Sequence, residues 1–388
     1  MHPAASTQVA SEPSLRFIRP TVPPSGEVLQ EYLPCYGDGM LTNGKLVTRL
    51  EAAVAERLGV SHCVAVSSCT SGLILVLKVL GVRGEVVLPS FTFFATGHAV
   101  LWNGATPVFA DCDSESWTVD PADVEAKITE QTQAILAVHL YGNPAPIEEL
   151  QRIASRHEAK LIFDAAHAFG SCYRGIPVGG FGDAEVFSLS PTKLLVAGEG
   201  GLVCTNDATL ARLLRAARNY GDAGNYDPEI LGLNARMTEF NAALALAGMG
   251  LVDHKVKRHN RIAQRYTDLL HGIPGIRLQH IDNRNCCTYK DFSILVSPAE
   301  FGMHRDEVAE VLAAEGIPTK KYFHPPLHRQ RLFKSNRAAS SPALPNTERI
   351  SEEVLSLPIY ESLANENVER IVLAIRQVTS LNSLERCA

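Results

Sequence analysis

The chain has 388 residues, of which 36 are Lys or Arg and 42 are Asp or Glu, so its formal net charge is −6. Hydrophobic residues make up 46% and charged residues 20%, a composition typical of a globular protein with a sizeable core rather than a disordered chain. The mild negative charge argues against a nucleic-acid or membrane-surface protein, which usually presents a basic face. At about 150 residues per domain, the length predicts two to three domains, or one large and one small.

The nine cysteines are scattered, odd in number, and form no Cys-x-x-Cys pair. This pattern favours free thiols in a reducing compartment over a disulfide framework or a zinc site, and we predict no metal. Residues 1–14 lack the apolar stretch of a signal peptide. The longest charge-free apolar stretch, residues 242–252, is shorter than the about 20 residues that a membrane span needs. We therefore expect a cytoplasmic protein that does not bind a membrane.

The first two thirds of the chain alternate between helical and strand patterns. Residues 1–15 are predicted to be a flexible tail, and residues 45–58 an amphipathic helix with leucine or valine at four-residue spacing. Further helices are predicted near 72–80 and 147–157. Short apolar runs predict seven strands, at 63–66, 85–89, 107–110, 134–140, 160–163, 185–189 and 201–205. This alternation predicts an α/β fold in which a large domain, residues 16–252, contains a mostly parallel seven-stranded sheet.

After about residue 250 the pattern changes, and residues 253–388 are predicted to form a smaller C-terminal α+β domain. We expect a helix at 253–270, a strand at 292–296, a helix at 305–315, a loop at 335–345, and final helices at 350–355 and 366–381. Because parallel sheets bind ligands at the carboxyl ends of their strands, the chemistry is expected directly after the strands of the large domain.

One such strand ends in Asp164, and His167 follows three residues later. A carboxylate at the end of a buried strand needs a partner, which can be a metal, an arginine or a protonated heterocycle. The alternative is that Asp164 caps a helix, which is the more common role when this segment is considered alone.

The segment 186–193 is a predicted strand followed by a proline-containing turn that presents Lys193. Lys193 comes 29 residues after Asp164, so one strand crossover would bring both to the same edge of the sheet. A partly desolvated lysine has a lowered pKa and is suited to Schiff-base chemistry. The alternative is a lysine whose stem packs on the sheet while its ammonium reaches water.

Two further segments follow predicted strands. Residues 65–72 place small hydroxyl residues at a helix start, which suits phosphate binding, or simple capping by Ser68 or Thr70. Residues 89–96 contain three aromatic residues that offer a stacking face, or pack in the core. A phosphate site, a stacking ring, a carboxylate and a lysine amine are together what pyridoxal 5′-phosphate (PLP) needs.

At this point the sequence resembles the sugar aminotransferases of the DegT/DnrJ/EryC1/StrS family, a branch of the fold-type-I PLP enzymes. The resemblance extends from about residue 17 to about residue 381. It rests on the order and spacing of GMLTNG (39–44), SCTSG (68–72), PSFTF (89–93), GATPVFAD (104–111), VHLYGN (138–143), DAAH (164–167), SLSPTK (188–193), GEGG (198–201), NARMTE (234–239) and YFHPPLH (322–328).

The resemblance implies roles for individual residues. Lys193 matches the lysine that bonds covalently to the cofactor, and Asp164 matches the partner of its pyridine nitrogen. His167 takes the place of a residue beside the ring's 3-hydroxyl, and Phe93 matches the stacked aromatic. Thr70 and Ser188 match phosphate contacts, and the implied cofactor site also includes Ser68, Cys69 and Asn234. Cys69 stands where the family usually has glycine.

The resemblance also implies a homodimer with shared active sites, in which Asn234 reaches the cofactor phosphate of the neighbouring subunit. The implied substrate contacts lie in segments that border the sugar site and are Thr42, Asn43, Lys320, Tyr322 and His328. Lys320 and Lys321 stand in a segment where the family often has arginine.

The implied reaction moves an amino group from an amino acid, expected to be L-glutamate, to a keto group of a nucleotide-linked deoxy sugar. PLP passes through its pyridoxamine phosphate form, and the amino sugar serves a glycosylated metabolite such as an antibiotic, or a polysaccharide. One alternative acceptor is a keto-cyclitol (an inosose) in aminocyclitol biosynthesis. A sugar dehydratase is disfavoured because Lys193 is present where those relatives have histidine. A non-catalytic PLP-binding regulator is disfavoured by the complete set of matched site residues.

Overall fold

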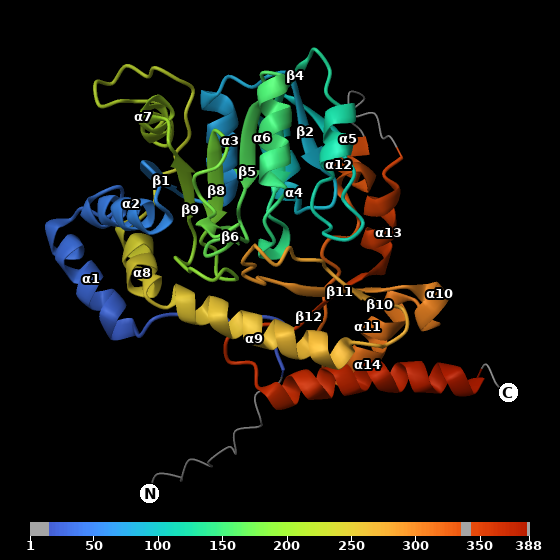
Figure 1. Cartoon of the computed structure of the whole chain (residues 1–388). Coiled ribbons are helices and arrows are strands. Elements are labelled where there is room, and N and C mark those ends of the chain that lie inside the picture. Colours follow the sequence, from blue (N-terminus) through green and yellow to red (C-terminus); the bar gives the residue numbers. More distant parts are fainter. Residues whose placement is uncertain (1–14, 335–342, 386–388) are drawn as a thin grey trace, which may run out of the picture.

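The computed structural model describes residues 15–334 and 343–385. A seven-stranded sheet lies between helices in the upper part of Figure 1, and a smaller α+β layer lies below it. The strands follow the order β1-β9-β8-β5-β4-β2-β3. Their bounds are β1 His62–Val66, β2 Glu85–Pro89, β3 Thr106–Ala110, β4 Thr132–Val138, β5 Lys160–Asp164, β8 Ala184–Ser188 and β9 Gly201–Thr205.

Strands β3, β2, β4, β5 and β8 run parallel, whereas β9 is antiparallel to both of its neighbours, β8 and β1. The predicted mostly parallel seven-stranded sheet is therefore confirmed. In register, Asp164 of β5 lies between Val138 of β4 and Val186 of β8. The carboxyl ends of these three strands consequently meet at one edge of the sheet.

Alternate residues of each strand face opposite layers of helices, as a pleated strand requires. On β1, Val64 and Val66 join one core cluster, while Cys63 and Ala65 join another. The first face is covered by α3 (Cys69–Val79), α4 (Phe94–Trp102) and α7 (Ala208–Ala217), and the second by α2 (Lys45–Leu58), α8 (Glu239–Met249), α6 (Ile147–Arg156) and α5 (Pro121–Ala126). The prediction of a helix at 45–58 is confirmed.

Below this sheet, α9 (Val252–Leu270), α11 (Arg305–Ala314) and α14 (Asn365–Glu385) pack on a three-stranded antiparallel sheet (Figure 1). The sheet contains β10 (Ile276–Leu278), β11 (Phe292–Val296) and β12 (Val354–Leu357). The predicted helix at 350–355 is partly wrong, because α13 (Pro345–Glu353) ends earlier and Val354 begins β12. Burial and pairing with β11 override the helical pattern there.

The remaining elements are short or were not predicted. The sequence analysis missed α1 (Ser25–Asp38), whose sequence contains Pro34 and buries only Val28 and Cys35. The short elements are β6 (Cys172–Tyr173), β7 (Ile176–Pro177), η1 (Leu140–Gly142), α10 (Pro298–Phe301), η2 (Leu327–Arg329) and α12 (Arg331–Lys334).

The predicted boundary between residues 252 and 253 stays a prediction. The lower layer has its own core, but Leu327, Phe333 and Leu344 return to the core of the large sheet. Most of the predicted tail and of the predicted 335–345 loop lies outside the described residues, while Leu15 packs on the lower core.

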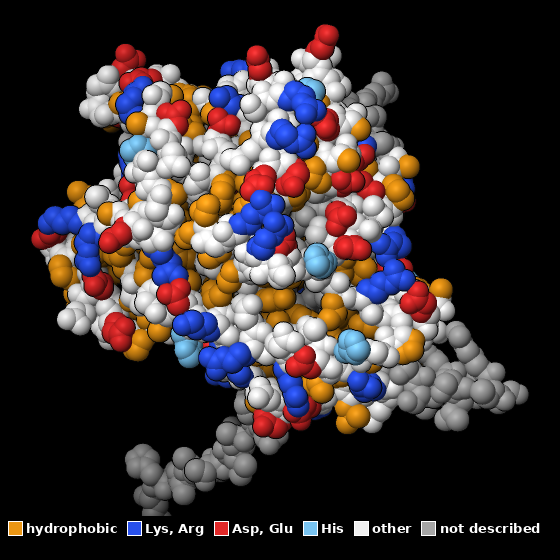
Figure 2. Space-filling view, viewed as in Figure 1, with side chains coloured by type: hydrophobic (Ala, Val, Ile, Leu, Met, Phe, Trp, Pro, Cys, Tyr) orange, Lys and Arg blue, Asp and Glu red, His pale blue; other side chains and the backbone are white. Residues whose placement is uncertain are grey.

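On the face shown in Figure 2, Lys and Arg side chains are interspersed with Asp and Glu. Within residues 15–334 and 343–385, no helix has the length and apolarity required to cross a bilayer.

Candidate active site

A cavity of about 300 Å³ opens at the edge of the sheet where β4, β5 and β8 end. It brings together nine of the residues singled out in the sequence, from segments far apart in the chain. They are Ser68, Cys69, Thr70, Phe93, Asp164, His167, Ser188, Lys193 and Tyr322. Strand ends therefore supply most of this site.

Asp164 is the last residue of β5, and its side chain is buried. One carboxylate oxygen accepts a hydrogen bond from the Thr96 hydroxyl at 2.7 Å, and the other from the Ala166 N–H at 3.1 Å. Burial raises the pKa of Asp164, while these hydrogen bonds and the charge of Lys193 oppose the rise. The described residues after Asp164 form turns, so the helix-cap alternative is wrong.

Lys193 follows β8 in a turn closed by the bond from its N–H to the Ser190 carbonyl, 3.0 Å long. Its side chain lines the same cavity as Asp164. Burial, followed by the nearby charge of Lys290, lowers the pKa of Lys193 to about 8. A substantial fraction of this amine is therefore neutral near physiological pH, as a nucleophile or proton acceptor requires.

His167 is held as a neutral imidazole. Its Nδ1 accepts the Tyr141 N–H at 3.2 Å, so the ring proton belongs on Nε2. Burial lowers its pKa well below the ordinary value, and the charges of Lys193 and Lys290 act in the same direction. His167 can therefore donate one hydrogen bond from Nε2 to an oxygen in the cavity.

The helix α3 starts in the wall of the same cavity. Ser68 is its N-cap and accepts the Ser71 N–H at 3.0 Å, and the Ser71 hydroxyl accepts the Ser68 N–H in return. The first N–H groups of a helix lack intrahelical partners, so this terminus is suited to an anion. Gly201 lets β9 approach, because a Cβ there would lie 2.5 Å from the Ser68 carbonyl carbon. Capping and anion binding are thus compatible.

The thiol of Cys69 contacts a side-chain oxygen of Asp164 at 3.8 Å and the Val186 carbonyl at 3.5 Å. Burial is the main cause of its raised pKa, which keeps it a thiol. The Cys69 side chain is therefore directed towards the sheet edge and the Asp164 carboxylate.

Comparisons with known proteins agree with this geometry. Residues 25–376 match the model of the DegT/DnrJ/EryC1/StrS aminotransferase family. The chain belongs to this family. The dTDP-4-amino-4,6-dideoxy-D-glucose transaminase of Escherichia coli is 34% identical over 91% of this chain and 96% of the relative. The UDP-N-acetyl-3-dehydro-alpha-D-glucosamine 3-aminotransferase of Acidithiobacillus ferrooxidans is 36% identical over 96% of this chain and 99% of the relative.

Among solved structures, DesI in the presence of its TDP-sugar product matches this aminotransferase with a TM-score of 0.91 and 36% identity. The match covers 97% of this chain and 96% of DesI. The family is one of PLP-dependent aminotransferases, so the expected fold and enzyme class are confirmed.

Three residues predicted for the site lie away from the cavity of their own chain. Thr42 donates to the Met237 carbonyl at 3.0 Å, and the Asn43 N–H donates to the same carbonyl at 3.0 Å. Asn234 pairs with Asn219 in an isolated bridge. Their roles towards cofactor or substrate stay predictions.

His328 and Lys320 also lie outside this cavity. His328 is buried, with Nδ1 at 2.6 Å from the Ser90 hydroxyl and Nε2 at 3.2 Å from Glu348. Lys320 pairs its backbone with Ser356 and lines an adjoining groove. The predicted substrate contacts of His328 and Lys320 stay predictions.

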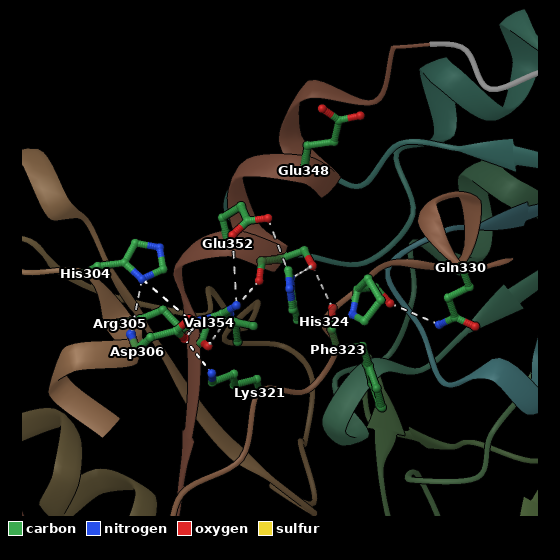
Figure 3. A network of polar contacts seen from close by, with 12 residues as sticks. His304, Arg305, Asp306, Lys321, Phe323, His324, Gln330, Glu348, Glu352 and Val354 are labelled. Carbon is green, nitrogen blue, oxygen red and sulfur yellow. Dashed lines mark hydrogen bonds and ion pairs between the residues drawn. The ribbon is translucent and has the colours of Figure 1, made fainter. Parts of the chain in front are cut away.

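The adjoining groove has a volume of about 400 Å³ and shares Phe93, Tyr322 and Phe323 with the cavity. Lys320, Lys321 and His324 line it as well. Figure 3 shows that the Lys321 ammonium, 2.6 Å from Asp306, belongs to a polar network in which Asp306 also accepts from Arg305 at 2.6 Å. Lys321 is thus held by a carboxylate.

Polar residues of the site that the sequence analysis missed include Thr96, Lys290 and Asp291. Thr96 supports Asp164, and Lys290 and Asp291 form a buried ion pair in the cavity wall, with the Lys290 ammonium 2.8 and 3.1 Å from the two Asp291 oxygens. Their sequence signal is a charged pair directly before the buried strand β11. Burying such a pair is costly, and the pair lines the same cavity as Lys193.

Proposed function

We propose that this aminotransferase uses PLP to move an amino group from L-glutamate to a keto group of a nucleotide-linked deoxy sugar. The observation that carries the proposal is that Asp164, His167 and Lys193 line one cavity with the N-terminus of α3. PLP, when bound, supplies an aldehyde that bonds to amines and a protonated ring that withdraws electrons.

The residues present fit this cofactor. The hydrogen-bond donors to Asp164 are Thr96, Ala166 and the Cys69 thiol, all of them neutral, so the buried carboxylate is suited to a further, cationic partner such as a protonated ring nitrogen. The α3 terminus with Thr70, together with Ser188 of the same cavity, would hold the phosphate. Phe93, which is 44% exposed, offers a face for stacking on the ring.

Each side chain of the cavity has its own role in the proposed reaction. With PLP bound, the Lys193 amine would hold the cofactor covalently and, once released, would accept the proton that leaves the α-carbon of the amino donor. Asp164 would keep the ring nitrogen charged, and His167 would donate from Nε2 to the ring oxygen. Tyr322 and Phe323 cover the cavity wall and limit access of water.

Nucleotide-linked sugars are favoured as acceptors by the groove beside the cavity. The Lys320 ammonium gives the groove positive charge, which suits a diphosphate, whereas a free keto-cyclitol has no charged group to bind there. The dTDP-, UDP- and TDP-sugar names of the relatives agree with this assignment. An assay with glutamate and UDP-, dTDP- and GDP-linked keto sugars, beside an inosose, tests the proposal. Turnover of the inosose alone would favour the cyclitol alternative.

A homodimer with shared sites forms part of the proposal. Asn234 lies in a segment rich in exposed apolar side chains, including Tyr226 at 98% and Leu231 at 74% exposure. Such surface is suited to burial against a second subunit. Analytical ultracentrifugation shows whether the protein is a dimer. Mixing the Lys193→Ala and Asn234→Ala variants tests whether each active site contains residues of both subunits. Because only one site of each mixed dimer would be intact, a one-to-one mixture should regain about a quarter of wild-type activity.

A further inference from the structure

A second, smaller cavity, of about 30 Å³, also contacts Lys193. It lies among the segment 18–21, the helix α9 and residues 359–361, which belong to the lower layer. One water molecule needs about 10–15 Å³ of volume accessible to its centre, so this cavity has room for about two.

The walls of the second cavity carry groups that bind water. Lys255 donates to the Thr21 carbonyl at 2.7 Å and the Leu194 carbonyl at 2.8 Å, so its third N–H is left for water. His259 Nδ1 lies 2.9 Å from the Tyr289 carbonyl and therefore donates to it, which leaves Nε2 as an acceptor. Donors and acceptors together make this a hydrated cavity rather than a dry one.

Glu361 connects the second cavity with the surface. Its Oε1 lies 3.2 Å from Nε2 of His254, a side chain that is 64% exposed. Its Oε2 is buried and has no hydrogen-bond partner among the described residues. A buried carboxylate oxygen without a partner is costly, and a water in the cavity that Glu361 lines would satisfy it.

We propose that Glu361 exchanges protons between Lys193 and bulk water through water held in the second cavity. This proposal rests on the proposed function, in which Lys193 is the reacting amine. One proton moves from the Lys193 ammonium to a cavity water, and that water gives one of its own protons to Glu361 Oε2. The carboxyl group then returns this proton to bulk water beside His254, so that no charge or electron is left over.

The reaction needs such a route because the amino donor arrives as an ammonium and must lose a proton before it can react. When a substrate fills the large cavity, that side is closed to water. Three cationic side chains line the second cavity together with Glu361, and these are Lys255, Lys290 and Arg19. The Arg258 guanidinium donates to the Glu361 main-chain carbonyl at 3.1 Å and leaves the carboxylate free.

A crystal structure at a resolution that shows water tests the first step, with or without cofactor. We expect an ordered water bonded to Glu361 Oε2 inside the cavity that Lys193 contacts. An empty cavity, or a Glu361 side chain turned wholly to solvent, would overturn the proposal.

Isotope exchange in the holoenzyme tests the second step. Glutamate deuterated at its α-carbon transfers the deuteron to Lys193, and the measured quantity is deuterium released to water per donor consumed. In Glu361→Gln this ratio should fall several-fold, because the amide accepts no proton, and Glu361→Asp should restore part of it. A purely structural role would lower turnover and leave the ratio unchanged, which would refute the route.

The matched control is Glu369→Gln, which removes another carboxylate that pairs with α9, here with Arg265 at 2.5 Å, away from the second cavity. Its exchange ratio should equal that of the wild type. Cofactor absorbance and thermal stability confirm that each variant is folded and loaded. A wild-type protein that takes up no cofactor would instead refute the proposed function.

Discussion

The floor of the active-site cavity and the C-terminal rim differ in how their residues are positioned. At the floor, Asp164, His167 and Lys193 follow strands of one sheet and all face the cavity. At the rim, within residues 320–328, Tyr322 faces the cavity, Lys320 faces the groove, and His328 is buried in a structural network. The ends of the strands position the residues of the floor, whereas contacts between segments distant in the sequence position the residues of the rim.

The largest effect is expected at the floor. Asp164→Asn should lower turnover by orders of magnitude, because an amide cannot keep a ring nitrogen charged. Thr96→Val removes one hydrogen bond to that carboxylate, worth about 1.5–3 kcal/mol, and should cost about 10- to 100-fold. The change in cofactor absorbance in a single turnover with glutamate measures the rates of both variants. Equal rates in Asp164→Asn and wild type would contradict the assigned role.

Replacing either member of the Lys290–Asp291 ion pair should shift the pKa of Lys193, in opposite directions for the two residues. The neutral fraction of Lys193 rises as pH passes its pKa of about 8, so the rate of cofactor attachment should rise there too. Lys290→Met removes a neighbouring cation and should move the midpoint to higher pH. Asp291→Asn removes an anion and should move it to lower pH. Shifts of the same sign would show that this ion pair does not set the pKa of Lys193.

At the rim, Lys320→Ala should raise KM for a nucleotide-linked acceptor several-fold and leave the half-reaction with glutamate unchanged. Lys321→Ala should do less, because Asp306 already neutralises that ammonium. Lys160→Ala, which removes an exposed lysine paired with Asp183 outside the groove, is the control. An equal loss of activity in both half-reactions would show that Lys320 has no specific role in binding the acceptor.

The smallest effect on turnover is expected at His328. Its replacement by Ala removes the partner of the Ser90 hydroxyl and should lower the free energy of unfolding by about 1–3 kcal/mol. Denaturant unfolding measures this loss. A large rise in acceptor KM with unchanged stability would restore the predicted substrate contact.

The sequence was sufficient for features that depend on local pattern. Short apolar runs predicted the seven strands, and Asp164 and Lys193 were found because each follows such a run. Features that depend on distant contacts were missed. The charged pair at Lys290 and Asp291 gives no sign in the sequence that the fold buries it, and α1 contains a proline that disfavours a helix.

The central claim is that the Lys193 amine bonds covalently to PLP. Borohydride reduction of the loaded protein, followed by peptide mapping, tests it directly. The account predicts one pyridoxyl group on Lys193 and its loss in Lys193→Ala, together with all turnover. Label on Lys290 or another lysine, or a protein that stays colourless with added PLP, would contradict it.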